Sequence, residues 1–500
     1  MQLVKAKNDS YTAISNNQYL HSKYSPEKEA EKFLLRWEEE YFSKDSSILI
    51  IFEPGLGYLL EKIHSYKNYK KILLIFFSPE TYQYYLANRL SSNFCAWNPG
   101  SAITIEKFLE SSFPESLPDN LNLMEWLPGE SCFPEKAKAI KTQFLKYMQI
   151  LQGNTITSMK FARRWLLNGL RNFLEQDYSL CIDKISDDIV IAASGFSLNH
   201  HLKDLKKKSD FCFIVALPSS VKALLEYEIV PDLIISTDPG FYASYHYRSF
   251  PENVPVLSPL SSYPWNFPAG NIGLNQNTWV DNLVDPERNY FKLTRPEMGT
   301  VAATAISLMH HISLSNIYII GLDLCIKGIQ EHTEPHSFDI LSALQSQRCH
   351  PEIHRRYERV QNMSSSYSKG YYYTNSMDTY SKWFNKESFS DRIFRIDSSP
   401  VSLPFESRLE LPDFIRKKRG KTSFYRNTGY PLYTERRAIL DKIGSDWRNK
   451  LSLLTGNAKI SPDDYFYDVI LNLYPRFDKL SDRNEVLFNM ERIVQKVSNL

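Results

Sequence analysis

The sequence has no long apolar run, no closely paired cysteines and no excess of charge of either sign. Because no stretch of about 18 apolar residues occurs, no membrane-spanning helix is predicted. Residues 1–17 also lack the apolar segment of a secretion signal. The six cysteines show no CxxC spacing, which indicates reduced thiols in a cytoplasmic protein. A formal net charge of +2 argues against a protein that binds nucleic acid through a large basic face.

The chain of 500 residues is too long for a single hydrophobic core, so several domains are expected. Composition and periodicity predict four segments. They are a small N-terminal α/β domain at 1–110, a connector at 111–182, a central domain at 183–410 and a helical C-terminal domain at 411–500. The connector is expected to begin as a loop at 111–135 and to continue as mostly helix. The basic stretch 416–426 at the start of the last segment is interpreted as a solvated linker, with an anionic partner surface as the alternative.

The N-terminal segment shows the pattern of a βαβ unit. The polar residues 1–30 are expected to form an extended or frayed arm, a helix is predicted to open at Pro26, and strands are predicted at 47–52 and 72–77. The turn 55–58, read GLGY, follows the first of these strands as a dinucleotide turn would. Since a third glycine and a ribose-binding acid are not both evident, we interpret it as a tight turn.

In the central segment, apolar runs alternate with helical patterns, which predicts a doubly wound, mostly parallel sheet. A helix is expected at 300–313 with Thr300 as its N-cap. The predicted strands are 189–193, 211–216, 232–236, 254–257, 290–293, 316–321 and, more weakly, 393–396.

The predicted strands end in small or polar residues. Ligands of open α/β sheets bind beyond the carboxyl ends of the strands, so these residues are the candidates for a nucleotide crevice. Small residues let the backbone approach a ligand, hydroxyls donate to phosphate, and carboxylates suit a sugar hydroxyl or a metal. Structural turns and helix caps are the alternative for each of them. The candidates are Ser194, Gly195, Phe196, Ser197, Asp238, Ser258, Gly299, Thr300 and Asp323.

Two histidines, His332 and His336, follow the strand at 316–321 by about ten residues. A histidine beside the crevice is suited to act as a general base because its pKa lies near neutral pH; surface histidines without a role are the alternative. The pairs at 200–201 and 310–311 are expected to serve in packing or capping. No convincing HxH spacing occurs, so no zinc site is expected.

The order of these motifs along residues 20–345 resembles that in the motility accessory factor (Maf) family of flagellin glycosyltransferases, with its central DUF115 domain. Phe196 stands where that family usually has Pro, and Leu322 where Gln is frequent. The segments that carry the resemblance are 21–30 (HSKYSPEKEA), 55–58 (GLGY), 194–198 (SGFSL), 231–232 (PD), 238–239 (DP), 299–302 (GTVA) and 320–324 (IGLDL).

This resemblance implies a cytoplasmic transferase that moves a nonulosonic, sialic-acid-like sugar from its CMP conjugate to Ser or Thr of flagellin, in support of flagellum assembly. It also implies a central domain similar to the Rossmann-type fold of sialyltransferases, with no cofactor and no metal. The nucleotide phosphate would lie on residues 194–197, with Asp238 on ribose or sugar and Ser258, Gly299 and Thr300 along the walls. His336 or His332 would take the acceptor proton, and Asp323 is the third catalytic candidate.

The same domain also resembles archaeal hydroxymethyl-dihydropterin pyrophosphokinases. That alternative implies ATP and Mg²⁺, with Asp238 and Asp323 as metal ligands, although the sequence contains no P-loop. A third hypothesis is a non-catalytic protein that binds flagellin or assists its export.

Overall fold

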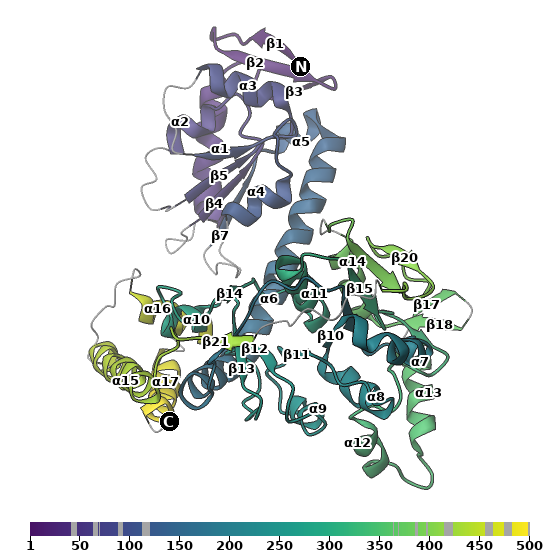
Figure 1. The fold of residues 1–500 in the computed structure, drawn as a ribbon. Helices are drawn as coiled ribbons and strands as arrows, with labels where there is room; N and C mark the ends of the chain where they lie inside the picture. The colour runs from purple at the N-terminus through teal and green to yellow at the C-terminus, as the bar shows by residue number, and fades with distance from the viewer. Residues whose placement is uncertain are drawn as a thin grey trace. The chain divides into compact units, whose positions relative to one another are not determined.

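The computed structural model is shown in Figure 1. Two compact units are distinguished, one of Met1–Ala162 with Ile470–Arg483 and one of Arg163–Val469 with Asn484–Leu500. Within the part of the chain that the structure describes, no helix is both long and apolar enough to cross a membrane. Residues 416–423 of the basic stretch lie outside the described residues. The structure describes residues 1–41, 48–63, 69, 71–88, 94–112, 121–363, 365–368, 370–385, 389–396, 399–414, 424–455, 464–474 and 483–498.

The first unit is built on a parallel sheet with the strand order β6-β5-β4-β7. The βαβ prediction is confirmed, but the expected arm is a small antiparallel sheet, β1-β2-β3. The elements are β1 Gln2–Lys5, β2 Tyr11–Ser15, β3 Gln18–Tyr19, α1 Pro26–Tyr41, β4 Ile48–Phe52, α2 Tyr58–Ile63, β5 Lys71–Ile75, α3 Pro79–Asn88, β6 Cys95–Trp97, α4 Ile105–Ser112, β7 Leu121–Glu125 and α5 Leu127–Cys132.

This sheet continues beyond residue 110, where the sequence placed the end of the N-terminal domain. Strand β7 lies in the stretch expected to be loop and pairs in parallel with β4, and α5 follows it. β7 reads LNLME, and only Asn122 and Met124 are buried. A strand buried at so few positions carries a weak apolar signal, which explains why the sequence does not reveal it.

The connector helix is confirmed as α6, which runs from Pro134 to Glu175. The larger sheet of the second unit follows, with eleven strands in the order β20-β19-β15-β9-β10-β11-β12-β13-β8-β21 and β14 beside β13. All of its neighbouring strands pair in parallel except β21 with β8. This confirms the expected α/β fold with a central, mostly parallel sheet.

The sheet is doubly wound around β9. The chain runs from β9 outward through β10 to β13, then returns to add β15 on the other side of β9. Side chains of β9 alternate between two cores: Ile189 and Ile191 pack with α11, whereas Val190 and Ala192 pack with α7 and α8. Because the chain first adds strands on one side of β9 and later on the other side, the switch point of the fold lies at the carboxyl end of β9.

The remaining elements follow along the chain and include the small antiparallel sheet β16-β18-β17. They are β8 Leu180–Ile182, β9 Ile189–Ala192, α7 Leu198–Lys208, β10 Phe213–Ala216, α8 Val221–Glu226, β11 Leu233–Ile235, α9 Ala243–Tyr247, β12 Val256–Pro259, β13 Asn271–Asn275, α10 Trp279–Val284, β14 Leu293–Thr294, α11 Val301–Ile312, β15 Ile317–Ile320, β16 Ile326–Lys327, α12 Asp339–Leu344, α13 Glu352–Met363, β17 Ser365–Ser368, β18 Tyr371–Tyr373, α14 Asn375–Phe384, β19 Ile393–Ile396, β20 Glu406–Arg408, β21 Phe424–Arg426, α15 Tyr433–Thr455, α16 Tyr465–Leu473 and α17 Arg483–Ser498. The strand predicted at 290–293 is only the short β14 in the structure. The strand β13 was not predicted.

Candidate functional site

The turns that follow β9 and β15 are bonded to each other at the switch point. The N–H of Gly195 donates to the carbonyl of Gly321 at 2.7 Å. Two residues on, the N–H of Ser197 donates to Asp323 Oδ2, also at 2.7 Å. These N–H groups are therefore satisfied inside the protein. This differs from the phosphate cradle expected of the turn, because parallel neighbouring strands bring the two turns within hydrogen-bonding distance.

Both glycines of this contact are required by packing. A Cβ on Gly195 would lie 2.3 Å from Asp323 Oδ2, and one on Gly321 would lie 2.5 Å from the carbonyl oxygen of Ala193. Gly321 also has a φ of 72°, in the left-handed region that favours glycine. The small residues at these strand ends thus allow two turns to approach each other.

The carboxyl group of Asp323 is buried, with 1% of the residue exposed. Burial raises the pKa of Asp323, while hydrogen bonds from Ser197 and the charge of Arg395 oppose that shift. Arg395 lies in β19 and is itself buried, which lowers its pKa to about 10. A buried carboxylate held in this way is a positioning group for the turn. The sequence does not indicate this role of Arg395, which lies within an apolar strand.

The predicted histidine segment lies over the turn after β9. The N–H of Thr333 donates to the carbonyl of Ser194 at 2.8 Å, and Gly195 and His332 form an isolated antiparallel bridge. Asn199, in the first turn of α7, accepts hydrogen bonds from the Thr333 hydroxyl and the Glu334 N–H at 2.8 and 2.9 Å. The structure therefore brings His332 to the switch point.

A cavity of about 360 Å³ opens beside this segment. Its walls come from the chain after β15 and from α12 and α13, and they combine both candidate histidines with carboxylate and guanidinium groups. The lining residues are Ile326, Ile329, Glu331, His332, Thr333, Glu334, His336, Phe338, Asp339, Ser342, Arg356, Arg359 and Val360.

His332 and His336 belong to a cluster of rings. Their imidazoles stack with centroids 4.7 Å apart and planes 8° from parallel. His246, from α9, lies 5.4 Å from His336 and 4.6 Å from Phe338. The sequence did not single out His246, which follows Asp238 by eight residues and reaches the site through α9.

The surroundings keep these histidines neutral at neutral pH. Burial, followed by the charges of neighbouring His332, His246 and Lys222, lowers the pKa of His336 to about 3. Burial also lowers the pKa of His246 to about 4 and lowers that of His332, for which Glu331 acts in the opposite direction. Neutral imidazoles at pH 7 are in the form that a general base needs.

The two stacked rings differ in what they can do. His336 is buried, and its Nδ1 accepts the N–H of Phe338 at 3.3 Å. The neutral His336 ring then carries its proton on Nε2, which is buried and has no hydrogen-bond partner among the described residues. The side chain of His332 is 44% exposed, and its Nε2 lies 3.8 Å from Glu331 Oε1. Of the two, His332 is the one placed to accept a proton and to have its positive charge balanced.

The other predicted residues have structural contacts of their own. Phe196 is buried against Tyr371, and Ser258 is hydrogen-bonded to Tyr178. The exposed Asp238 accepts the N–H of Gly240 at 2.7 Å. Thr300 accepts the N–H of Ala303 at 3.0 Å and so caps α11, as predicted.

Gly299 has a φ of 71° and open space where a Cβ would lie. Among the contacts of the described residues, none joins Asp238, Ser258, Gly299 or Thr300 directly to His332 or His336.

In the first unit, the turn after β4 is filled by the protein's own side chains. Glu53 is fully buried, and its Oε2 accepts the N–H of Phe77 at 2.5 Å. The imidazole of His21 accepts the N–H of Leu56 at 2.9 Å, and a Cβ on Gly55 would lie 2.3 Å from His21 Nε2. The interpretation of residues 55–58 as a tight turn agrees with these contacts.

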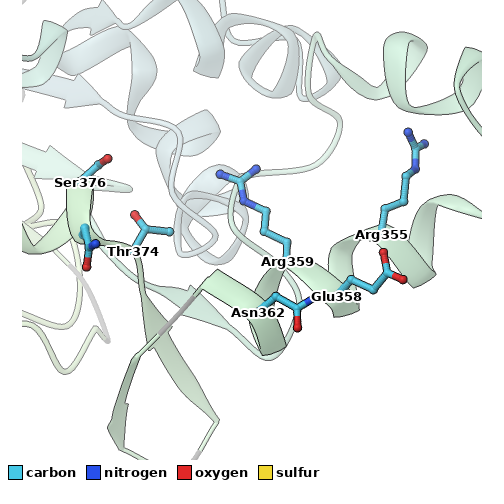
Figure 2. A pocket seen from close by; sticks show the side chains of 7 residues that line it. Arg355, Glu358, Arg359, Asn362, Thr374 and Ser376 are labelled. Carbon is cyan, nitrogen blue, oxygen red and sulfur yellow. The ribbon is translucent and has the colours of Figure 1, made fainter.

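A second cavity, of about 590 Å³, lies along α13 (Figure 2). Arg355, Glu358 and Arg359 line it from the helix, and Thr374 and Ser376 line it from the start of α14. Glu358 also belongs to a cluster with His350 and His354, whose ligand atoms all lie within 4.8 Å of one another. The sequence analysis missed this cluster, although its spacing, His-x₃-His-x₃-Glu, was a readable signal.

Part of the chain is similar in sequence to known proteins. Residues 165–328 match the family model described as 6-hydroxymethylpterin diphosphokinase MptE-like. A protein of Treponema pallidum (strain Nichols), described as uncharacterized, is 27% identical over 290 residues, which are 57% of this chain and 61% of that protein. The match thus spans about three fifths of the relative's length.

Among solved structures, that of the Maf glycosyltransferase from Magnetospirillum magneticum AMB-1 aligns with 100% of this chain and 90% of its own, with a TM-score of 0.60 and 11% sequence identity. At this identity the likeness shows the fold. Residues 165–328 are therefore similar to the MptE-like (DUF115) family, and the chain has the fold of a Maf glycosyltransferase.

Proposed function

We propose that this protein is a cytoplasmic glycosyltransferase that moves a nonulosonic sugar from a CMP conjugate to Ser or Thr hydroxyls of flagellin. The observation that carries the proposal is the stacked pair His332–His336, held against the turn after β9 and facing a cavity. The fold shared with a Maf glycosyltransferase supports it, since that fold serves sugar transfer in the related structure. No cofactor is required for this reaction.

In the proposed reaction, His332 takes the proton from the acceptor hydroxyl. The hydroxyl oxygen forms a bond to the anomeric carbon while the bond from that carbon to the CMP phosphate breaks, and CMP leaves with the electron pair. Glu331 stabilises the imidazolium that forms on His332, to which its carboxylate is close. His336, whose Nε2 is buried, holds the His332 ring in place through the stacking of the two imidazoles.

The donor nucleotide is proposed to bind along the carboxyl edge of the large sheet. Asp238 and Gly299 are the exposed candidates there, with Ser194 and Thr300 partly exposed. Gly195, Phe196, Ser197 and Asp323 keep the central turn in shape through the contacts described above. Departure of CMP leaves positive charge on the sugar, so oriented dipoles at this edge would contribute much of the catalysis.

The test is sugar transfer to flagellin in a reconstituted assay with a CMP-nonulosonate. Replacement of His332 by Gln is expected to lower kcat by about 10²–10⁴-fold, which is the usual contribution of a general base. His311→Gln is the matched control, because His311 is an exposed histidine at the end of α11. Full activity of His332→Gln would disprove the assigned base. Absence of transfer by the unaltered protein, together with flagellin binding, would favour a binding protein.

The pterin pyrophosphokinase alternative is favoured by one observation, the MptE-like match. It requires carboxylates for Mg²⁺, but the Asp323 carboxylate is buried and engaged by Ser197. Thermal stabilisation by CMP without metal would support the transferase, whereas stabilisation by ATP only with Mg²⁺ would support the kinase.

A further inference from the structure

The cluster of His350, His354 and Glu358 lies outside the site described above and is independent of the proposed function. His354 and Glu358 are four residues apart on α13 and therefore lie on the same face of the helix. His350 stands just before the helix, where the N–H of His350 donates to the carbonyl of Gln347 at 3.0 Å and the reverse bond measures 3.2 Å. Backbone structure thus holds all three residues in place.

Both imidazoles approach the carboxylate of Glu358, each at a different oxygen. His350 Nε2 lies 3.6 Å from Glu358 Oε2, and His354 Nε2 lies 3.6 Å from Glu358 Oε1. Ligands bound to zinc at its usual bond lengths in a tetrahedron are about 3.3 Å apart. The three ligand atoms lie within 4.8 Å of one another, so the groups need to close by up to about 1.5 Å to share one ion, which rotation of these partly exposed side chains allows.

From this convergence we propose that His350, His354 and Glu358 bind a divalent transition-metal ion such as Zn²⁺ or Co²⁺. Two imidazole nitrogens and one carboxylate favour these metals over Mg²⁺ and Ca²⁺, which take oxygen ligands. Three protein ligands leave a fourth position for water or an anionic oxygen. Because Glu358 also lines the cavity of Figure 2, that position adjoins a surface with two arginines, Arg355 and Arg359.

Without a metal, the same groups would form two exposed side-chain contacts. The side chains of His350, His354 and Glu358 are 42%, 51% and 43% exposed. Exposed pairs of this kind contribute little to the stability of a protein. Metal affinity therefore distinguishes a built site from incidental pairing.

The test is titration of the full-length, tag-free protein with ZnCl₂ by calorimetry, and with CoCl₂ by visible absorbance. We expect one Zn²⁺ per chain, a Co²⁺ spectrum of a four-coordinate site that Zn²⁺ but not Mg²⁺ abolishes, and at least tenfold weaker binding by His354→Gln and by Glu358→Gln. His311→Gln should bind as the unaltered protein does.

Equal Zn²⁺ affinity in the unaltered protein and in the His350→Gln/His354→Gln double variant would overturn the proposal, as would the absence of Zn²⁺ binding. Melting curves recorded without metal report whether each variant is folded. His354→Cys supplies an independent check, because a thiolate ligand should restore the binding that His354→Gln loses.

Discussion

His332 and His336 lie with their rings parallel and 4.7 Å apart, yet only His332 is accessible from the solvent. The same stacking that orients His332 disfavours a charge on both rings, because two imidazolium ions at this distance would repel each other. At most one of the two rings is therefore expected to be cationic under ordinary conditions, and this property leads to a pH dependence.

Transfer activity should persist below pH 6.5. A general base must be neutral, so kcat/KM falls as the pH falls through the pKa of the base. The covering of part of the His332 ring by its neighbours, together with the charges of Arg359 and Arg356, lowers the pKa of His332 below its ordinary value of 6.5, although Glu331 opposes them. The loss of activity is therefore displaced to lower pH. A pH profile of the reconstituted transfer reaction measures it.

The variant Glu331→Gln should move the acidic limb of that profile to still lower pH, because Glu331 raises the pKa of His332. An acidic limb at or above pH 6.5 in the unaltered protein would contradict the assignment.

Substitution of Gly321 should destabilise the protein more than its positive φ alone would explain, because of the close packing around it. Gly321 and Gly328 both have a positive φ, of 72° and 62°, but a Cβ on Gly328 meets nothing within 4 Å. Gly328→Ala should cost about 1 kcal/mol for the backbone conformation. Gly321→Ala should cost more than about 3 kcal/mol, since its Cβ would meet backbone atoms of Ala193. Urea denaturation gives both free energies of unfolding. Equal losses would show that the two turns separate easily.

The cap and the proposed ligand role of Thr300 can be separated. Thr300→Ala removes the hydrogen bond to the N–H of Ala303 and should lower the free energy of unfolding by about 1 kcal/mol. Thr300→Asn keeps a capping acceptor and should restore that stability. If Thr300 also contacts the donor, both variants should weaken CMP binding in a calorimetric titration. Unchanged CMP affinity in both would assign Thr300 to the helix alone.

Glu53 should make the protein less stable as the pH rises toward neutral. Burial raises the pKa of Glu53 from 4.5 to about 7. The protonated carboxyl is favoured in the folded state, so this contribution is complete below about pH 4.5 and is lost as the pH rises through 7. The shift corresponds to about 3 kcal/mol.

Glu53→Gln should remove this dependence, measured as the difference in urea stability between the variant and the unaltered chain at pH 4.5 and 7.5. The comparison is needed because burial lowers the pKa of His21 to about 3, so His21 destabilises the protein as the pH falls. A difference that is the same at both pH values would contradict the raised pKa of Glu53.

The core strands of the large sheet could be predicted because they are buried on both faces. Strands β9 and β15 read IVIA and IYII, with all positions buried, and such runs are visible without tertiary information. β13 is equally buried, but it reads NIGLN, and its asparagines and glycine conceal it. Prediction of a buried strand from the sequence therefore depended on the types of its side chains rather than on its burial.

The candidate site was predictable only in part. His332 follows β15 closely in sequence, so the fold carries it to the switch point. Asn199 and His246 come from two other helices, and their approach depends on how α7 and α9 pack. The sequence could not show whether Ser197 and Asp323 bind a ligand or form a hydrogen bond with each other. Which of the two occurs depends on how closely the two turns approach.

The contact between the turns after β9 and β15 joins positions that are 126 residues apart in the chain. A side chain at position 195 would occupy the space of the Asp323 carboxylate, so a larger residue at one position demands a smaller one at the other. Sequence change at either position during evolution should consequently be conditional on the other, and the pair should vary together among descendants of this chain.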